Sequence, residues 1–481
     1  MKFSFVAAAT AALSLSTLVS ADGDRIAHAR QAEKMKRVPQ ASSSSSSTST
    51  LATSSKPSST SNGISSSTTS GAPAAQTTPA TVITIDPLSS ITAGVATGPT
   101  LPLTTTYLPG ATPPIEGAPP LPTFVFNKAD WPDIDRIPPT DSDEVKEWMQ
   151  ELEGFDIPDL EIAVNGTCAA NPQLAADAAN RGWWTCGGYT RPTDITFCPD
   201  KLTWGMSFDD GPTPYTPQLL KFLTDQQLKA TFFVVGSRVI SFPDILREEY
   251  MSGHEISVHT WSHHTLTNLT NEQVVAELGW ARKAIQDVLG ITPTTMRPPF
   301  GDIDDRIRAI SLAMGLQPII WTRGPMNNQF DTNDWKVPGG EVTAPQAVQS
   351  FLDILNNATI IDTGFIVLEH DLFPQEVDLS VGYFLPAALG FTPKLDLKPI
   401  GTCQGWPETN MYLETTTNAT FPYPDSPAAS QATTTAQARA TAVANAGGKG
   451  GSSSNGAVSR GSGVLGMVIG VVAVVAGVQM F

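Results

Sequence analysis

The feature that most constrains the fold is a repeated alternation of short apolar runs and helical segments between residues 201 and 400. The apolar runs of strand length cover residues 202–208, 230–235, 316–321 and 364–368, and another strand ends at residues 257–258. The helical segments cover residues 216–223, 271–289, 305–314 and 344–355. Repeated strand-then-helix units predict a parallel sheet covered by helices, which is an α/β fold.

Polar side chains follow the predicted strands. Asp209-Asp210, His259 and His370 fall just after predicted strands, and Arg297 follows the short segment Thr295-Met296. In folds built from strand-helix units, chemistry is concentrated at the carboxyl ends of the strands. We therefore expect these clusters to meet in one cleft.

The first two clusters together suggest a metal site. Adjacent carboxylates such as Asp209 and Asp210 repel each other unless a metal or a cation neutralises them. His259 and His263 are four residues apart, so both imidazoles can bind one ion from the same helical turn. Alone, the first cluster is better explained as a solvated turn and the second as surface histidines. Combined with Asp210, the histidines form a candidate site with an open position for water, and zinc is the expected ion for such ligands.

The third cluster, Leu368-Glu369-His370-Asp371, ends an apolar strand. A histidine that emerges there into a cleft suits the role of a general acid. A hydrogen-bonded histidine in the core explains the same pattern equally well when the cluster is considered alone.

Taken together, the clusters resemble the polysaccharide deacetylases of carbohydrate esterase family four, which include fungal chitin deacetylases. The resemblance covers residues 198–391. Five motifs in order support it: Ser207-Phe-Asp-Asp-Gly211, His259-Thr-Trp-Ser-His263, Arg297-Pro-Pro-Phe-Gly301, Asp331-Thr-Asn-Asp-Trp335 and Leu368-Glu-His370. Each motif is weak alone, but five in this order are specific. The resemblance implies a distorted (β/α) barrel of the NodB-like type, flanked here by disordered Ser/Thr-rich segments.

The resemblance also implies a role for each site residue. Asp210, His259 and His263 would hold one divalent metal, Zn²⁺ or Co²⁺. Asp209 would be the general base, paired with Arg297. His370 would be the general acid, positioned by Asp334. The substrate contacts would come from the backbone N–H of Phe300, which would bind the oxyanion, and from Trp335 and Leu368. Ser207 and Phe300 replace the family's usual Thr and Tyr, and neither change removes a group that the chemistry needs.

The reaction implied by the resemblance is metal-dependent hydrolysis of the N-acetyl groups of chitin, giving chitosan and acetate during cell-wall remodelling. The expected partners are chitin polymer or oligomers and other cell-wall glycans. Hydrolysis of acetyl esters in acetyl xylan or another polysaccharide is the enzymatic alternative. A wall-binding protein that kept the fold without turnover is an alternative of another class.

The charge distribution argues against nucleic acid as a partner. The chain has 481 residues and a formal net charge of −17. Residues 116–425 carry 19 basic and 42 acidic side chains, a balance of 19 − 42 = −23. Such a surface repels a phosphate backbone, although acidity also simply keeps an extracellular protein soluble.

Both ends of the chain have the character of targeting segments. Residues 1–21 have a basic start, an apolar run and the small-residue ending Val19-Ser20-Ala21, which predicts a secretory signal peptide. Residues 464–481 form an apolar stretch after a small, polar spacer, which is typical of a GPI-attachment signal. We expect attachment at Asn455, which would make the plasma membrane a partner. A spanning helix is the alternative, but no basic anchor follows the stretch.

Composition divides the rest of the chain. Residues 41–70 contain 22 Ser or Thr in 30 positions, too polar a stretch for a packed core. The expected divisions are a signal peptide (1–21), a disordered stalk with a candidate propeptide (22–115), an extension packed on the catalytic domain (116–200), the catalytic domain (201–400), a closing segment (401–425), a disordered linker (426–455) and the GPI propeptide (456–481).

Glycosylation and disulfides are both expected in a secretory compartment. Four sequons begin at Asn165, Asn268, Asn357 and Asn418. The four cysteines, Cys168, Cys186, Cys198 and Cys403, predict two disulfides with three open pairings. Proximity in sequence favours a local Cys186–Cys198 bridge, and Cys168–Cys403 would then join the front of the domain to its back.

Overall fold

The fold is a distorted barrel of parallel strands surrounded by helices, as expected, and we describe it from a computed structural model. The described residues are 76–77, 85–93, 100–324 and 328–417. The signal peptide, residues 41–70, Asn418, Asn455 and the apolar C-terminal stretch lie outside them. No helix in the described ranges has both the length and the apolar character needed to cross a membrane.

Eight strands in two parallel sheets form the barrel. The larger sheet consists, in order, of β4 (Ser207–Asp209), β5 (Thr231–Val234), β6 (Glu255–Val258), β7 (Thr295–Met296) and β8 (Gln317–Pro318). The smaller sheet consists, in order, of β10 (Asp396–Lys398), β3 (Thr203–Gly205) and β9 (Phe365–Ile366). A separate antiparallel pair, β1 (Gln76–Thr77) and β2 (Thr105–Thr106), lies outside the barrel.

Backbone hydrogen bonds between the sheets close the ring. The N–H of Asp209 donates to the carbonyl of Glu369 (3.0 Å), which joins the end of β4 to the segment after β9. The N–H of Thr322 donates to the carbonyl of Ile366 (3.0 Å), which joins the segment after β8 to β9. The apolar run at residues 202–208 thus serves both sheets. It divides into β3 and β4 at Met206, whose N–H bonds to Lys398 and whose carbonyl bonds to Thr231.

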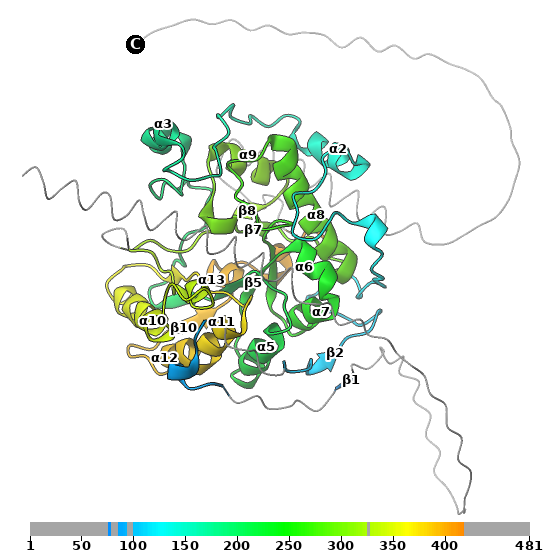
Figure 1. Cartoon of the computed structure of the whole chain (residues 1–481). Helices are drawn as coiled ribbons and strands as arrows, with labels where there is room; N and C mark the ends of the chain where they lie inside the picture. The colour runs from blue at the N-terminus through cyan, green and yellow to red at the C-terminus, as the bar shows by residue number, and fades with distance from the viewer. Residues whose placement is uncertain (1–75, 78–84, 94–99, 325–327, 418–481) are drawn as a thin grey trace, which may run out of the picture.

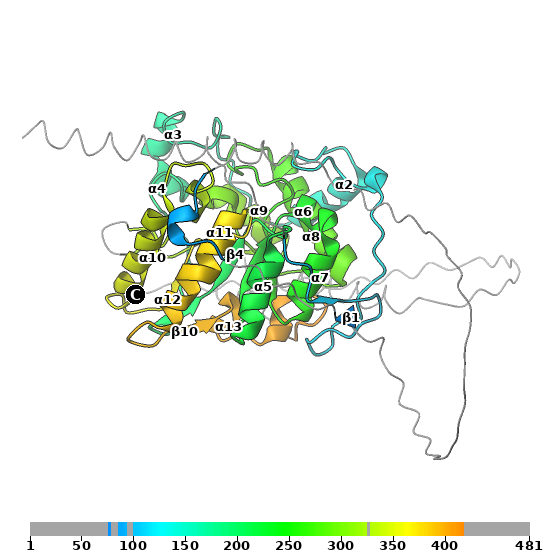
Figure 2. The ribbon, with the colours of Figure 1, turned by 60° about the horizontal axis from the view of Figure 1, so that its bottom comes forward.

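Helices cover the outside of the barrel. They are α5 (Thr216–Asp225), α6 (Gly236–Ser241), α7 (Pro243–Met251), α8 (Asn271–Leu289), α9 (Asp305–Ala313), α10 (Ala344–Ala358), α11 (Pro374–Leu379), α12 (Leu385–Leu389) and α13 (Ile400–Cys403). Figure 1 shows β5, β7 and β8 in the middle, α6 to α8 on the right, α9 above, and α10 and α12 on the left. Figure 2 shows α5 beside α11, where the Gln218 side chain donates to Asp378 (2.9 Å).

The longest helix, α8, illustrates why these elements form. A capping box between Thr270 and Gln273 begins it, and Gly290, in the left-handed conformation, ends it. Its apolar stripe, which includes Val274, Leu278 and Ile285, is fully buried against the barrel.

The segment before the barrel packs on α8. It contains α2 (Asp143–Met149), α3 (Pro172–Ala176) and α4 (Ala178–Arg181). Trp148 of α2 meets Trp280 of α8 edge to face, with ring centroids 5.4 Å apart. Trp131 stacks on Trp261 at 6.0 Å with nearly parallel rings. Aromatic pairs of this kind stabilise a contact beyond the area that they bury.

The two expected disulfides are present, but the favoured pairing is wrong. Cys168 pairs with Cys186, and Cys198 pairs with Cys403. The reason is that the chain between Cys186 and Cys198 does not form a closed loop. Ile195 forms an isolated parallel bridge with Ile319, next to β8, and the chain then brings Cys198 to β3 and to Cys403 of α13.

The two bridges should contribute unequally to stability. In the loop-entropy account, a bridge spanning 205 residues stabilises by about 5 kcal/mol and one spanning 18 residues by about 3 kcal/mol. We therefore expect the C198S/C403S variant to lose more free energy of unfolding than the C168S/C186S variant, as measured by chemical denaturation. A larger loss from C168S/C186S would contradict this account.

Candidate active site

The site begins with two buried carboxylates at the end of β4. Asp209 and Asp210 have exposed fractions of 1% and 0%. Asp210 adopts a left-handed backbone conformation (φ 80°), which is uncommon for a residue other than glycine. The nearest charged or titratable partner of each side chain is different: Arg297 for Asp209, and the imidazoles of His259 and His263 for Asp210.

Arg297 is the partner of Asp209. It follows β7 and is fully buried, and its Nη1 lies 2.6 Å from Asp209 Oδ1. Its guanidinium also lies 4.0 Å from the centre of the Phe233 ring. Burial lowers the pKa of Arg297, while the charge of Asp209 acts in the opposite direction. The pair therefore holds one oxygen of Asp209 in a fixed place.

The two histidines of the second motif are the partners of Asp210. His259 Nε2 lies 3.3 Å and His263 Nε2 3.1 Å from Asp210 Oδ1. Although burial raises the pKa of Asp210, the nearby His263, His259 and Arg238 hold it well below its ordinary value. Neither oxygen of Asp210 has a hydrogen-bond donor among the described residues apart from these imidazoles.

These three side chains fit a divalent metal ion. One ligand atom from each of Asp210, His259 and His263 lies within 4.8 Å of the others, and within the described ranges only these residues form such a group. His259 Nδ1 lies 2.7 Å from the carbonyl of Arg297, so it carries the proton and leaves a lone pair on Nε2. A carboxylate oxygen and two imidazole nitrogens are donors suited to zinc or a similar ion.

The loop between the two histidines is held by a residue that the sequence did not single out. Glu277 on α8 is fully buried, and its carboxylate accepts hydrogen bonds from the backbone N–H groups of Trp261 (2.9 Å) and Ser262 (2.9 Å). Burial raises the pKa of Glu277 to about 7, against these hydrogen bonds. Its position in the buried stripe of α8 is the signal that could have identified it, because a carboxylate there needs a polar partner.

His370 and Asp334 form the third part of the site. His370 Nδ1 lies 2.8 Å from Asp334 Oδ1, and the His370 N–H donates to Asp334 Oδ2 (2.8 Å). Asp209 and His370 pair as parallel backbone neighbours. Burial lowers the pKa of His370, but the charge and hydrogen bond of Asp334 raise it well above its ordinary value.

A cavity of about 140 Å³ joins these groups. It is lined by Trp184, Thr185, Asp209, His259, His263, Phe300, Trp321, Arg323, Gln329, Asp331, Trp335, Leu368 and His370. Seven of the ten predicted catalytic, metal and substrate residues line this cavity. The other three, Asp210, Arg297 and Asp334, each contact a residue that lines it. Phe300 has a left-handed backbone (φ 60°), and its ring centroid lies 4.8 Å from that of His263.

Several residues of the cavity come from outside the five motifs. Trp184 and Thr185 belong to the loop closed by the Cys168–Cys186 disulfide, and Arg323 and Gln329 belong to the segment after β8. The adjacent tryptophans Trp183 and Trp184 are visible in the sequence as candidate sugar-binding residues, but only one of them lines the cavity. Trp183 is buried and donates to Asp302 (3.0 Å), whereas Trp184 lines the cavity.

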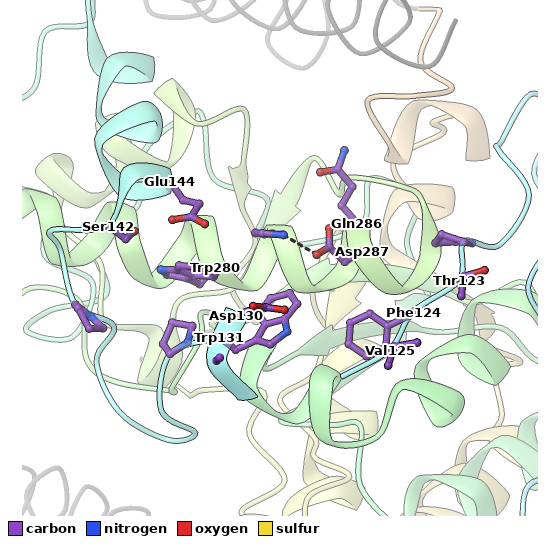
Figure 3. Close-up of a pocket in the computed structure, with 15 residues that line it drawn as sticks. Thr123, Phe124, Val125, Asp130, Trp131, Ser142, Glu144, Trp280, Gln286 and Asp287 are labelled. Atoms are coloured by element: carbon purple, nitrogen blue, oxygen red, sulfur yellow. Dashed lines mark hydrogen bonds and ion pairs between the residues drawn. The ribbon is translucent and has the colours of Figure 1, made fainter. Parts of the chain in front are cut away.

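A larger cavity of about 890 Å³ lies elsewhere, between the segment before the barrel and α8. Figure 3 shows Phe124, Trp131 and Trp280 around it, with Glu144 and Asp287 at its edges. None of the predicted catalytic or metal residues lines it. The smaller cavity, which contains the convergent polar groups, is the candidate active site.

Three of the four predicted glycosylation sites lie in described residues. Asn165 is exposed, and Asn268 and Asn357 are partly exposed. The Asn268 side chain accepts a hydrogen bond from Thr265 (2.7 Å). Their modification remains a prediction.

Comparisons with known proteins identify the family of the chain. Residues 198–319 match the polysaccharide deacetylase family model. The chain is 49% identical over 353 residues to chitin deacetylase 1 of Cryptococcus neoformans var. grubii, which covers 73% of this chain and 74% of that protein. It is 35% identical over 268 residues to the chitin deacetylase of Amylomyces rouxii, which covers 52% of this chain and 61% of that protein.

The solved structure of the chitin deacetylase from the fungal pathogen Colletotrichum lindemuthianum also matches this chain, with 26% sequence identity and a TM-score of 0.40. The match covers 46% of this chain and 94% of the Colletotrichum chain. Family membership follows from the Cryptococcus relative, because the identity is high and most of both chains is covered. This chain belongs to the polysaccharide deacetylase family, and its Cryptococcus and Amylomyces relatives are chitin deacetylases.

Proposed function

We propose that this chain hydrolyses the N-acetyl groups of N-acetylglucosamine units in chitin, giving chitosan and acetate during cell-wall remodelling. The observation that carries the proposal is the convergence of three groups on one cavity: the Asp209–Arg297 pair, the Asp210–His259–His263 cluster and the His370–Asp334 pair. The names of the relatives support chitin as the substrate.

An acetamide makes two demands on a catalyst. Its carbonyl is a poor electrophile, and its amine is a poor leaving group unless it is protonated. A hydrolase therefore needs a group that stabilises the oxyanion, a base that activates water and an acid that protonates the amine. The cavity contains candidates for all three.

Asp210, His259 and His263 would hold the metal, for which we propose Zn²⁺ or Co²⁺. When bound, such an ion lowers the pKa of a water molecule and polarises a carbonyl group. The hydrogen bond between His259 Nδ1 and the Arg297 carbonyl orients the imidazole and fixes its tautomer.

Asp209 is the proposed general base. Arg297 binds its Oδ1, while its Oδ2 lies 4.0 Å from His259 Nε2. The second oxygen therefore faces the metal ligands, where a water molecule would lose its proton. A charge-assisted bond to a buried guanidinium holds Asp209 in one orientation.

His370 is the proposed general acid. Asp334 binds its Nδ1 and its backbone N–H, and its Nε2 is the atom that we propose protonates the departing amine. We assign oxyanion binding to the backbone N–H of Phe300, and substrate contact to Trp335 and Leu368. All three line the same cavity as His370.

Asp209→Asn tests the proposed base. The change keeps the size of the side chain but removes its basicity, so kcat for acetate release from chitin oligomers should fall by about 10²–10⁴-fold. Asp209 is outside the metal-ligand group, so metal content should stay at the wild-type level. The same substitution at Asp225 on the surface of α5 is the matched control and should leave kcat unchanged.

The same experiment separates the alternatives. A wall-binding protein without turnover predicts that Asp209→Asn changes nothing, because no acetate is released in either case. An acetyl esterase predicts that wild-type protein releases acetate from acetylated xylan and not from chitin oligomers.

Asp334→Asn tests the proposed acid through pH dependence. A general acid must be protonated, and Asp334 raises the pKa of His370, so activity persists as pH rises through the ordinary range of histidine. Without the carboxylate charge the pKa of His370 falls, and the alkaline limb of the kcat/KM profile should move to lower pH. An unmoved limb, or one at higher pH, would contradict the assignment.

We further propose that the enzyme follows the secretory route and is held by a GPI anchor on the outer face of the plasma membrane, next to the cell wall. The divisions given above stand as part of this proposal. Two disulfides among the described residues support an oxidising compartment. Anchor attachment at Asn455 would remove residues 456–481.

A tag fused after Phe481 tests the anchor. The mature protein should lack the tag and should leave membranes when they are treated with phosphatidylinositol-specific phospholipase C. A variant that ends at residue 455 should be secreted into the medium. A membrane-bound protein that retains the tag and resists the phospholipase would instead support a spanning helix.

A further inference from the structure

An arginine without a counter-charge lines the active-site cavity. Arg323 follows β8 and pairs through its backbone with Gln329, and both side chains line the cavity that contains His259 and His370. No carboxylate of the described residues forms an ion pair with Arg323, and its buried Nε has no acceptor there. Burial lowers the pKa of Arg323, and no neighbouring charge contributes to the shift.

The surrounding residues hold this guanidinium in place. Its carbon lies 4.8 Å from the centre of the Trp184 ring, and Trp184 meets Trp321 edge to face at 4.7 Å. Trp321 in turn donates to Gln329 (2.8 Å). A Cβ at Gly188 would lie 1.8 Å from Arg323 Nη1, so the guanidinium packs directly against the backbone of Gly188.

Trp184 connects Arg323 to the reaction centre. Its ring lies against Gly301, where a Cβ would approach the ring to 2.4 Å, and Gly301 directly follows Phe300. Arg323 therefore lies next to the position that we assign to the reacting acetamide. Arg323 lines the same cavity as Asp209 and His370 but forms no ion pair or hydrogen bond with either among the described residues, so we assign it to a neighbouring sugar unit of a bound chain rather than to the reacting unit.

The acids of the cavity do not neutralise Arg323. Asp209 is paired with Arg297, and Asp331 accepts a hydrogen bond from the Asn333 N–H (2.8 Å). No ion pair joins Asp331 to Arg323 among the described residues, and no acid shifts the pKa of Arg323. A guanidinium is permanently charged and can only donate hydrogen bonds.

We propose that Arg323, held by Trp184, forms a subsite that accepts an uncharged sugar unit next to the reacting one and rejects a glucosamine unit. The proposal rests on the proposed function. The hydroxyl and carbonyl oxygens of a neutral unit can accept from Arg323, whereas the ammonium group of glucosamine has the same charge sign and has no lone pair to offer.

Such a subsite would affect how glucosamine units are distributed along the product chain. Each turnover converts a neutral unit into a cationic one. A chain that carries such a unit at this position binds less well, so deacetylation of the next unit in that direction is slowed. The enzyme then produces separated glucosamine units in that direction rather than an uninterrupted run.

The test uses pentamers of N-acetylglucosamine, either fully acetylated or with one glucosamine at a known position. Wild-type enzyme should lose about tenfold or more in kcat/KM when glucosamine occupies one particular position next to the reacting unit. Arg323→Gln should remove most of that penalty, while Arg323→Lys, which keeps the charge, should retain it. Lys201→Gln removes a surface charge and should behave as wild type.

A pentamer with a neutral glucose unit at the same position tests the idea without any variant. If charge is what the subsite rejects, wild-type enzyme should accept glucose there better than glucosamine. The inference is overturned if Arg323→Gln keeps the wild-type positional profile, or if glucose is rejected as strongly as glucosamine. Failure of the wild type to release acetate from the fully acetylated pentamer would overturn the proposed function, and this inference with it.

Discussion

The structure depends on the burial of two adjacent carboxylates at the end of β4. Two like charges taken out of water destabilise a fold unless each is compensated. Asp209 is compensated by Arg297, and Asp210 lies among His259, His263 and Arg238. The division of partners suits the two acids to the different roles that we propose for them, a general base for Asp209 and a metal ligand for Asp210.

The barrel is what makes this division possible. Parallel strands bring their carboxyl ends to one edge, so β4, β6 and β7 supply Asp210, His259 and Arg297 to the same place. The backbone bonds between Asp209 and the segment after β9 close the ring and also place His370 opposite. Closure of the fold and assembly of the site therefore use the same hydrogen bonds.

Much of this was predictable from the sequence because it depends on local patterns. The helical stripe of α8 and the polar groups after β4, β6 and β7 lie where periodicity placed them. The disulfide pairing was not predictable from proximity, because Ile195 pairs with Ile319, far away in the sequence. Arg323 and Glu277 were missed for the same reason: their roles arise from contacts between segments that no motif links.

The most direct test of the account is metal content and acetate release measured on one preparation. Protein stripped with a chelator would be reloaded stepwise with Zn²⁺ or Co²⁺ and assayed on a chitin oligomer. The account predicts loss of activity on stripping and recovery in proportion to bound ion, complete at one ion per chain, because only the Asp210–His259–His263 group fits a metal among the described residues. Full activity in the stripped protein would contradict it.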